Sequence, residues 1–137
     1  MKKYLKNIPI ALLILIAVSC NKTPESFSFV QICDPQLGMG GYDHDTATLE
    51  QTVRQINEMD IDFAIFCGDL VNHASENSFA DFKNIITKLN IPYYYVPGNH
   101  DIGMVPNDTT LAFYRSTMDE DYYTLPQTAD TVTQVLN

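Results

Sequence analysis

The sequence contains no tryptophan and few basic residues. Eight lysines and arginines stand against 17 aspartates and glutamates, which gives a formal net charge of −9. An acidic surface repels phosphate backbones, so we do not expect a protein that coats nucleic acid. A negatively charged substrate would need a positive centre that the basic residues do not supply. Bound metal cations could supply it.

Several common motifs are also missing. The three cysteines and three histidines lack the spacing of a zinc motif. The glycine-rich segment 37–42 lacks the glycine order of a P-loop or a dinucleotide fingerprint, and there are no repeats or low-complexity tracts. We therefore do not expect a zinc finger, a nucleotide loop of these two types or a repeat protein.

The N-terminus has the organisation of a secretory signal. A basic head precedes an apolar run at 8–18, interrupted only by Pro9. The run is shorter than the about 20 residues that a transmembrane helix needs. The following Ala-Val-Ser-Cys at 17–20 matches a bacterial lipobox. This predicts a lipoprotein signal peptide at residues 1–19 and lipidation of Cys20.

This interpretation also predicts a location. Residues 20–26 would be a polar tether, and a lipid anchor would hold the protein at a membrane of the bacterial cell envelope, in the periplasm or on the cell surface. An ordinary signal peptide with an incidental cysteine and a plain transmembrane anchor are the alternatives. Loss of the signal, which holds three of the eight basic residues, would leave five basic against 17 acidic residues and a net charge of −12.

Behind the tether, strand and helix patterns alternate. The expected strands are runs at 27–33, 63–67 and 93–96, and the first resembles a strand covered on both faces. Two apolar stripes of helical spacing lie between them: Leu49, Val53, Ile56 and Met59, and then Phe79, Phe82, Ile85, Ile86 and Leu89. A β-α-β-α-β order predicts an α/β fold with a parallel sheet and right-handed crossovers.

The ends of the two helices carry capping signals. Asp43 or Asp45 can cap the first helix, which we expect to end near Asp60. Ser78 and Asp81 have the spacing of a capping box for the second helix.

The pattern changes after residue 101. We expect a loop at 104–108 and a short helix at 110–117. Two strands are expected at 122–125 and 131–136, joined by a turn.

Polar residues follow each of the three strands. Carboxyl ends of neighbouring parallel strands meet at one edge of a sheet, about 4.8 Å apart, so Asp34, Asp69 and Asn99 are expected together. Two carboxylates and an amide suit Mn²⁺, Mg²⁺ or Ca²⁺, and histidines would extend the range to Fe and Zn. Asp69 is the candidate bridge between two cations, and His100 could protonate a leaving alkoxide.

Three blocks in this order resemble the calcineurin-like metallophosphoesterase family. They are Asp-Pro-Gln at 34–36, Gly-Asp-Leu-Val-Asn at 68–72 and Gly-Asn-His-Asp at 98–101. The resemblance covers residues 27 to 137. It implies a four-layer αββα sandwich, two divalent metal ions (Mn, Fe, Zn or Mg) and hydrolysis of a phosphate-ester substrate.

The resemblance also implies roles for single residues. Asp34 would ligate one metal ion, Asp69 would bridge both, Asn99 would ligate the second, and His100 would be the catalytic histidine. Gln36 stands where the family usually has the histidine of an Asp-x-His block. Its amide oxygen is a weaker, neutral ligand that either binds a metal or does not. A branch resembling a phosphoprotein phosphatase shares the Asp-Pro-Gln variant.

Two further residues stand behind the predicted ligands. Asn72 lies near the catalytic histidine in the family, and Asp101 orients a neighbour or caps a turn. His44 and His73 are expected on the surface, without a ligand role.

The family's later histidines have no counterpart here, because none follows His100. We therefore expect residues 27–137 to be the N-terminal part of a truncated metallophosphoesterase domain, with weak metal binding and little turnover. The rival hypothesis is a non-catalytic surface lipoprotein that keeps the fold and binds a partner or a glycan.

Cys33 and Cys67 each end an apolar strand. An oxidising compartment would permit a disulfide between them. Buried free thiols are the preferred interpretation.

Overall fold

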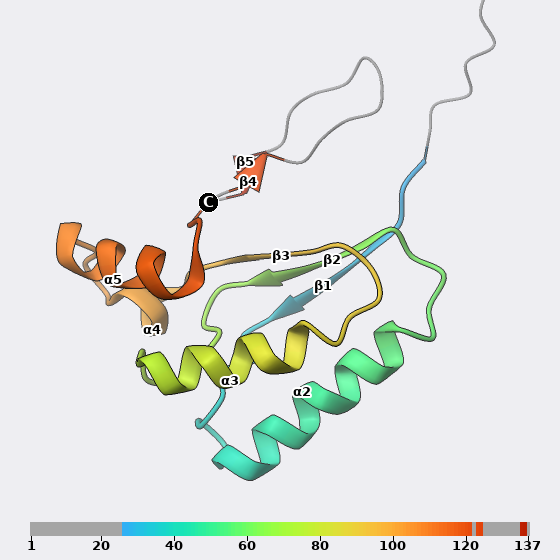
Figure 1. Cartoon of the computed structure of the whole chain (residues 1–137), viewed down its shortest axis with the longest axis horizontal. Helices are drawn as coiled ribbons and strands as arrows, with labels where there is room; N and C mark the ends of the chain where they lie inside the picture. The colour runs from blue at the N-terminus through green and yellow to red at the C-terminus, as the bar shows by residue number, and fades with distance from the viewer. Residues whose placement is uncertain (1–25, 122, 125–134, 137) are drawn as a thin grey trace, which may run out of the picture.

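The computed structural model describes residues 26–121, 123, 124, 135 and 136, which form an α/β structure (Figure 1). Strands β1 (Phe29–Cys33), β2 (Phe63–Cys67) and β3 (Tyr93–Val96) make a parallel sheet in the order β1-β2-β3. The predicted α/β class and the parallel sheet are therefore confirmed. The first strand begins two residues later than expected, at Phe29.

Two helices connect the strands, α2 (Tyr42–Ile56) and α3 (Glu76–Ile86). Both lie on the same side of the sheet (Figure 1). The chain moves from β1 to β2 and from β2 to β3 in the same direction across the sheet. Two right-handed crossovers in the same direction place both connecting helices on one face. The order of the strands thus explains why α2 and α3 pack side by side.

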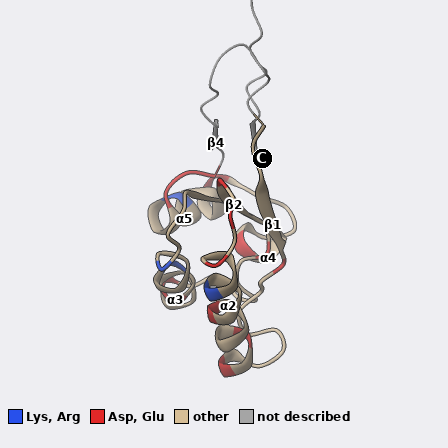
Figure 2. Cartoon of the chain, turned by 90° about the vertical axis from the view of Figure 1, so that its right-hand side faces the viewer, with Lys and Arg blue, Asp and Glu red and all other residues tan. Residues whose placement is uncertain are grey.

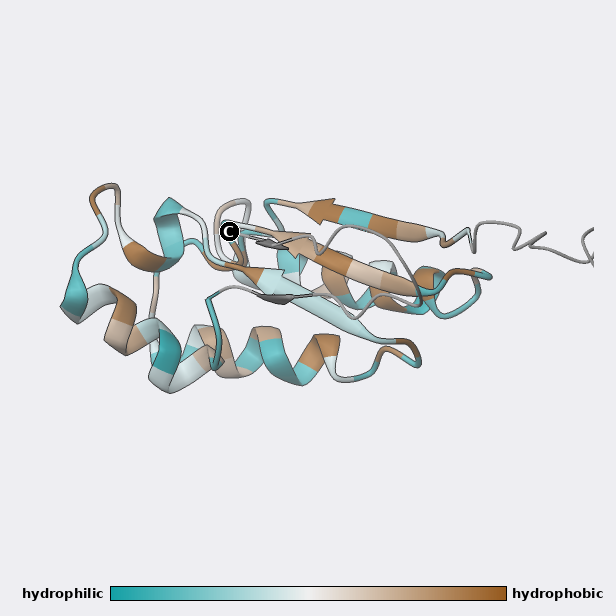
Figure 3. Ribbon diagram, turned by 90° about the horizontal axis from the view of Figure 1, so that it is seen from above, coloured by the Kyte–Doolittle hydropathy of each residue, from teal (hydrophilic) through white to brown (hydrophobic). Residues whose placement is uncertain are grey.

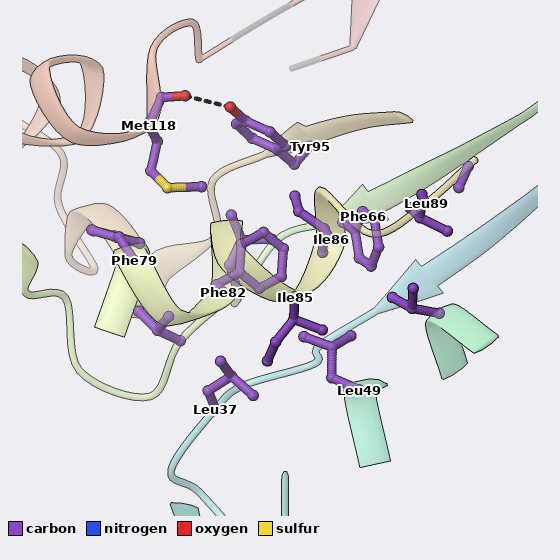
Figure 4. Packing of buried hydrophobic residues seen from close by; sticks show 14 of the residues in the cluster. Leu37, Leu49, Phe66, Phe79, Phe82, Ile85, Ile86, Leu89, Tyr95 and Met118 are labelled. Atoms are coloured by element: carbon purple, nitrogen blue, oxygen red, sulfur yellow. Dashed lines mark hydrogen bonds between the residues drawn. The ribbon is translucent and has the colours of Figure 1, made fainter. Parts of the chain in front are cut away.

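The core lies between this face and the two helices (Figure 4). Phe66 of β2 and Phe82 of α3 are fully buried and meet edge to face, with ring centroids 5.4 Å apart. Such a geometry adds to the free energy gained from burying the two rings. The predicted helical stripes supply most of the helix side of this core.

On the opposite face of the sheet, the β1 side is exposed within the described residues, whereas Ile65 of β2 and Val96 of β3 are buried. Phe29 of β1 is 46% exposed, and its ring stacks on Phe63 at 5.2 Å. Tyr94 meets Phe63 edge to face, so aromatic rings run across all three strands. The expectation that β1 is covered on both faces is wrong for this part of the chain, although β1 and β2 are mainly hydrophobic along their length (Figure 3). Cys33 is exposed on this face as well, against the expected burial.

The boundaries of α2 differ from the prediction. The helix ends at Ile56, and Met59, which we expected in its apolar stripe, lies beyond the helix and is 49% exposed. Gly41 occupies the N-cap position without a side-chain hydrogen bond, so neither Asp43 nor Asp45 caps the helix. Both aspartates lie in the first turn, where the positive end of the helix dipole favours negative charge.

The cap of α3 also differs from the prediction. Ser75, not Ser78, is the N-cap, and the capping box pairs Ser75 with Ser78 rather than Ser78 with Asp81. The Ser75 hydroxyl accepts from the Ser78 amide at 3.1 Å, and the Ser78 hydroxyl accepts from the Ser75 amide at 3.1 Å. Sequence spacing alone could not separate two serines three positions apart.

Replacing Ser75 with alanine is expected to lower the free energy of unfolding by about 1 kcal/mol, because the first turn of α3 loses its cap. Urea denaturation monitored by circular dichroism measures this change. The matched control is Asn77→Ala in the same exposed turn, with an expected change below about 0.5 kcal/mol. Equal losses in the two variants would contradict the role of the cap.

Two more helices follow β3: the single turn α4 (Asn99–Ile102) and α5 (Asp108–Met118). The helix predicted at 110–117 is thus confirmed and is longer at both ends. The Tyr95 hydroxyl donates to the carbonyl of Met118 at 2.6 Å, which fixes the end of α5 to β3 (Figure 4).

Two short strands, β4 (Tyr123–Thr124) and β5 (Val135–Leu136), pair antiparallel. They fall inside the two predicted strands, and the predicted turn between them lies outside the described residues. The signal peptide, Cys20 and almost all of the tether also lie outside the described residues. No helix in the described part of the chain is long and apolar enough to span a membrane. Acidic residues outnumber basic ones along the ribbon (Figure 2), in line with the net charge.

Candidate metal centre

The polar residues predicted to act together lie beyond one end of the sheet. Cys33 is the register partner of Cys67, and Cys67 is the partner of Val96. The three strands therefore end level with one another. Asp34, Asp69 and Asn99 follow these ends within one to three residues, at the edge where ligands bind in open α/β sheets.

Three of the predicted metal ligands have an unusual backbone conformation. Asp34, Gln36 and Asp69 have positive φ angles of 51°, 40° and 48°. Positive φ is uncommon for residues other than glycine, because it costs conformational free energy. Residues with such strained backbones are concentrated at functional sites. The turns after β1 and β2 are thus both built on the left-handed conformation, at the predicted ligand positions.

Backbone hydrogen bonds join the loop after β1 to the loop after β2. The Gln36 amide donates to the Asp69 carbonyl at 2.9 Å, and the Leu37 amide donates to the Leu70 carbonyl at 3.3 Å. In the opposite direction, the Asn72 amide donates a hydrogen bond to the Leu37 carbonyl at 3.0 Å. The two loops continue the parallel pairing of the strands, so Gln36 is fixed beside Asp69.

The loop after β3 lies directly against Asp69. A Cβ atom at Gly98 would lie 2.2 Å from both the backbone nitrogen and Oδ1 of Asp69, so only glycine fits there. The His100 amide donates to the same Oδ1 at 3.0 Å. One Asp69 carboxylate oxygen is thereby oriented by α4, while Oδ2 has no recorded partner among the described residues.

Asp101 connects the second and third loops from behind. Its side chain is 2% exposed and accepts three backbone N–H bonds, from Leu70 at 3.0 Å, Val71 at 3.1 Å and Gly98 at 2.7 Å. Burial raises the pKa of this carboxyl group, and the three donors oppose the rise. Asp101 thus closes the turn of α4 through Gly98 and joins it to the loop after β2 through Leu70 and Val71, whereas its role behind the metal ligands stays a prediction.

His100 is half-buried, and its ring is held by the backbone. Nδ1 lies 2.9 Å from the carbonyl oxygen of Asn72. A carbonyl only accepts, so Nδ1 carries the hydrogen, and Nε2 remains the nitrogen that can gain or release a proton. Asn72 therefore contacts the histidine through its main chain, whereas its side chain donates to the Gly38 carbonyl at 3.3 Å.

The glycine-rich loop is organised by Asp45, which sequence reasoning missed. Its carboxylate accepts from the amides of Gly38 and Gly40 at 3.0 and 2.9 Å. The His44 ring and these two amides lower the pKa of Asp45. An aspartate a few positions after a run of glycines, at a helix start, is the signal that could have identified this role. His44 and His73 are exposed, as expected.

The donor set fits part of a divalent metal site. Two carboxylates and two side-chain amides follow the strand ends, and oxygen donors of this kind suit hard cations. Within the described residues, however, no three or more His, Cys, Asp and Glu side chains form a metal-binding group. Of the four predicted donors, only the two aspartates are charged, and a metal site built on them would need further ligands.

Comparisons with known proteins agree with this architecture. The family model "Calcineurin-like phosphoesterase" matches residues 27–135. The chain belongs to the calcineurin-like phosphoesterase family, whose members use divalent metal ions.

Two similar relatives are vertebrate proteins named serine/threonine-protein phosphatase CPPED1. Those of Danio rerio and Bos taurus are each 32% identical over 120 residues, covering 71% of this chain and 38% of the relative. A probable glycerophosphodiester phosphodiesterase, GpdQ of Arcobacter nitrofigilis, is 38% identical over 40 residues, covering 29% of this chain and 15% of that protein. The chain thus spans 38% of the length of the CPPED1 proteins that it matches.

Proposed function

We propose that the protein is a metal-dependent phosphoester hydrolase, a phosphatase or a phosphodiesterase. This proposal rests on the convergence of three strand ends on Asp69. Asp34 and Asp69 both have left-handed backbone conformations there, and only glycine fits at position 98. Family membership supports the same reaction class, since the named relatives are a phosphatase and a phosphodiesterase.

Each residue of the site has a proposed task. Asp34, Asp69 and Asn99 would hold two divalent ions, Mn, Fe, Zn or Mg, with Asp69 between them and Gln36 as a further neutral oxygen donor. Bound cations would supply charge stabilisation at the phosphoryl oxygens and a nucleophile near neutral pH. These ions would also be the positive centre that the acidic chain lacks.

His100 would handle the proton of the leaving group. Because Nδ1 donates to the Asn72 carbonyl, Nε2 is the atom free to donate when the ring is protonated. Asn72 and Asp101 would hold this arrangement, the first through its carbonyl oxygen and the second through the loop amides. Neither needs to touch the substrate.

We expect the 137-residue chain to bind Mn²⁺ weakly and to hydrolyse an aryl phosphate slowly, since the described residues offer two charged candidate ligands, Asp34 and Asp69. Asp69→Asn should weaken Mn²⁺ binding by about tenfold or more, because the proposed bridge loses its charge. Isothermal titration calorimetry measures the affinity, and release of nitrophenol from p-nitrophenyl phosphate measures the turnover. Asp81→Asn, a surface change on α3, is the control. Equal affinities for the chain and its Asp69→Asn variant would contradict the proposed bridge.

A second candidate is a non-catalytic surface lipoprotein. It is favoured by the small number of charged candidate ligands, since no three or more His, Cys, Asp and Glu side chains form a metal-binding group within the described residues. The genomic reading frame beyond Asn137 separates the two: further histidines there favour the hydrolase, and a stop codon favours the binding protein. For either candidate we propose lipidation at Cys20 and anchoring to a bacterial envelope membrane, which metabolic labelling with a fatty-acid analogue would test.

A further inference from the structure

Two thiols lie side by side at the ends of β1 and β2. Cys33 and Cys67 are register partners in neighbouring parallel strands, which are spaced about 4.8 Å apart. Partners in register project to the same face of a sheet, here the face opposite α2 and α3. A separation of this size is within the about 4.4–6.8 Å between Cα atoms that disulfides span.

The surroundings of the two thiols favour exchange chemistry. Both are free in the structure, and Cys33 is exposed while Cys67 is half-buried. The Gln31 side-chain amide lies 3.3 Å from the Cys33 sulfur and is positioned to donate to a thiolate. Gln31, Cys33 and Cys67 therefore lie together on one face of the sheet.

We propose that Cys33 and Cys67 form a reversible intramolecular disulfide by exchange with a small disulfide oxidant such as oxidised glutathione. The exposed Cys33 thiolate attacks the oxidant, forming a mixed disulfide and releasing one thiolate. The Cys67 thiol then loses its proton to solvent, and its sulfur displaces the second thiolate from Cys33. The two cysteines are oxidised by two electrons, and one oxidant disulfide is reduced to two thiols.

The bond would join the strand ends immediately before Asp34 and Gly68. It would hold the spacing of β1 and β2 at the edge that carries the candidate ligands. The inference does not depend on phosphoesterase activity, because it rests on strand register and thiol exposure alone.

The test uses the full chain with Cys20→Ser, so that no third thiol takes part. After equilibration with excess oxidised glutathione, we expect neither remaining cysteine to react with N-ethylmaleimide, and a proteolytic digest to contain a peptide linked through Cys33 and Cys67. Dithiothreitol should restore both reactive thiols. The oxidised form should unfold about 10 °C above the reduced form.

Two single variants serve as controls. Cys67→Ser should stop at the mixed disulfide, with glutathione retained on Cys33, and should show no such shift in unfolding temperature. Cys33→Ser should lose the rapid exchange, because the remaining thiol is less exposed. Alkylation of both cysteines after oxidation, stable glutathione adducts on both, or a bond only between two molecules would each overturn the proposal.

Discussion

Replacing Gly98 with alanine is expected to disrupt the candidate metal centre and to lower the free energy of unfolding by about 3 kcal/mol or more. The new methyl group would lie 2.2 Å from the Asp69 amide nitrogen and carboxylate oxygen, far inside van der Waals contact. Relief requires the Asp69 loop and α4 to separate, which breaks the bond from the His100 amide. Urea denaturation and Mn²⁺ titration measure the two effects.

Gly103→Ala is the matched control for this change. Gly103 has a φ of +87° with nothing within 4 Å of the new Cβ, whereas Gly98 has an ordinary φ of −108° and no space. The control should cost about 1 kcal/mol through backbone strain, and its Mn²⁺ affinity should be unchanged. If Gly98→Ala resembles Gly103→Ala in both measurements, the close approach to Asp69 is not what makes glycine necessary.

Replacing Asp101 with alanine is expected to cost about 3 kcal/mol as well, because three buried amides lose their acceptor at about 1–3 kcal/mol each. Relief from burying a charged group offsets part of this loss, as the raised pKa of Asp101 indicates. The loops after β2 and β3 would separate, so Mn²⁺ affinity should fall together with stability.

Asp101→Asn distinguishes the acceptor role from simple space filling. Asparagine keeps the shape of the side chain and one oxygen, so it can still accept hydrogen bonds from some of the three amides. The free energy of unfolding of this variant should therefore lie between those of the wild type and the alanine variant. Chemical denaturation of the three proteins gives this order. An asparagine variant as unstable as the alanine variant would show that both oxygens are needed, while an alanine variant as stable as the wild type would contradict the role altogether.

Much of the fold follows from patterns within the sequence. Alternating β-rich runs and helical stripes predict the sheet, and the order of the elements fixes which strand ends are neighbours. Asp34, Asp69 and Asn99 could be placed at one edge by this argument, because strand register depends on hydrophobic faces and short connections.

The predictions that were wrong concern positions where alternative caps or helix ends have similar free energy. Two serines three residues apart compete for one cap, and a helix can end at Ile56 or run on to Met59 with little difference in propensity. The close contact between Gly98 and Asp69 joins residues 29 positions apart, and no local pattern encodes it. The exposed face of β1 could not be predicted either, since an apolar run does not reveal which neighbours cover it.

The hydrogen bonds around Asp69 have a consequence for the order of folding. They connect residues separated by about one β-α-β unit, as from His100 to Asp69 and from Asp101 to Leu70. Contacts between such distant positions form only after the intervening chain has collapsed. Metal affinity should therefore appear last during refolding, after helical signal has returned, and a rapid-mixing experiment with Mn²⁺ would report the completion of the native topology.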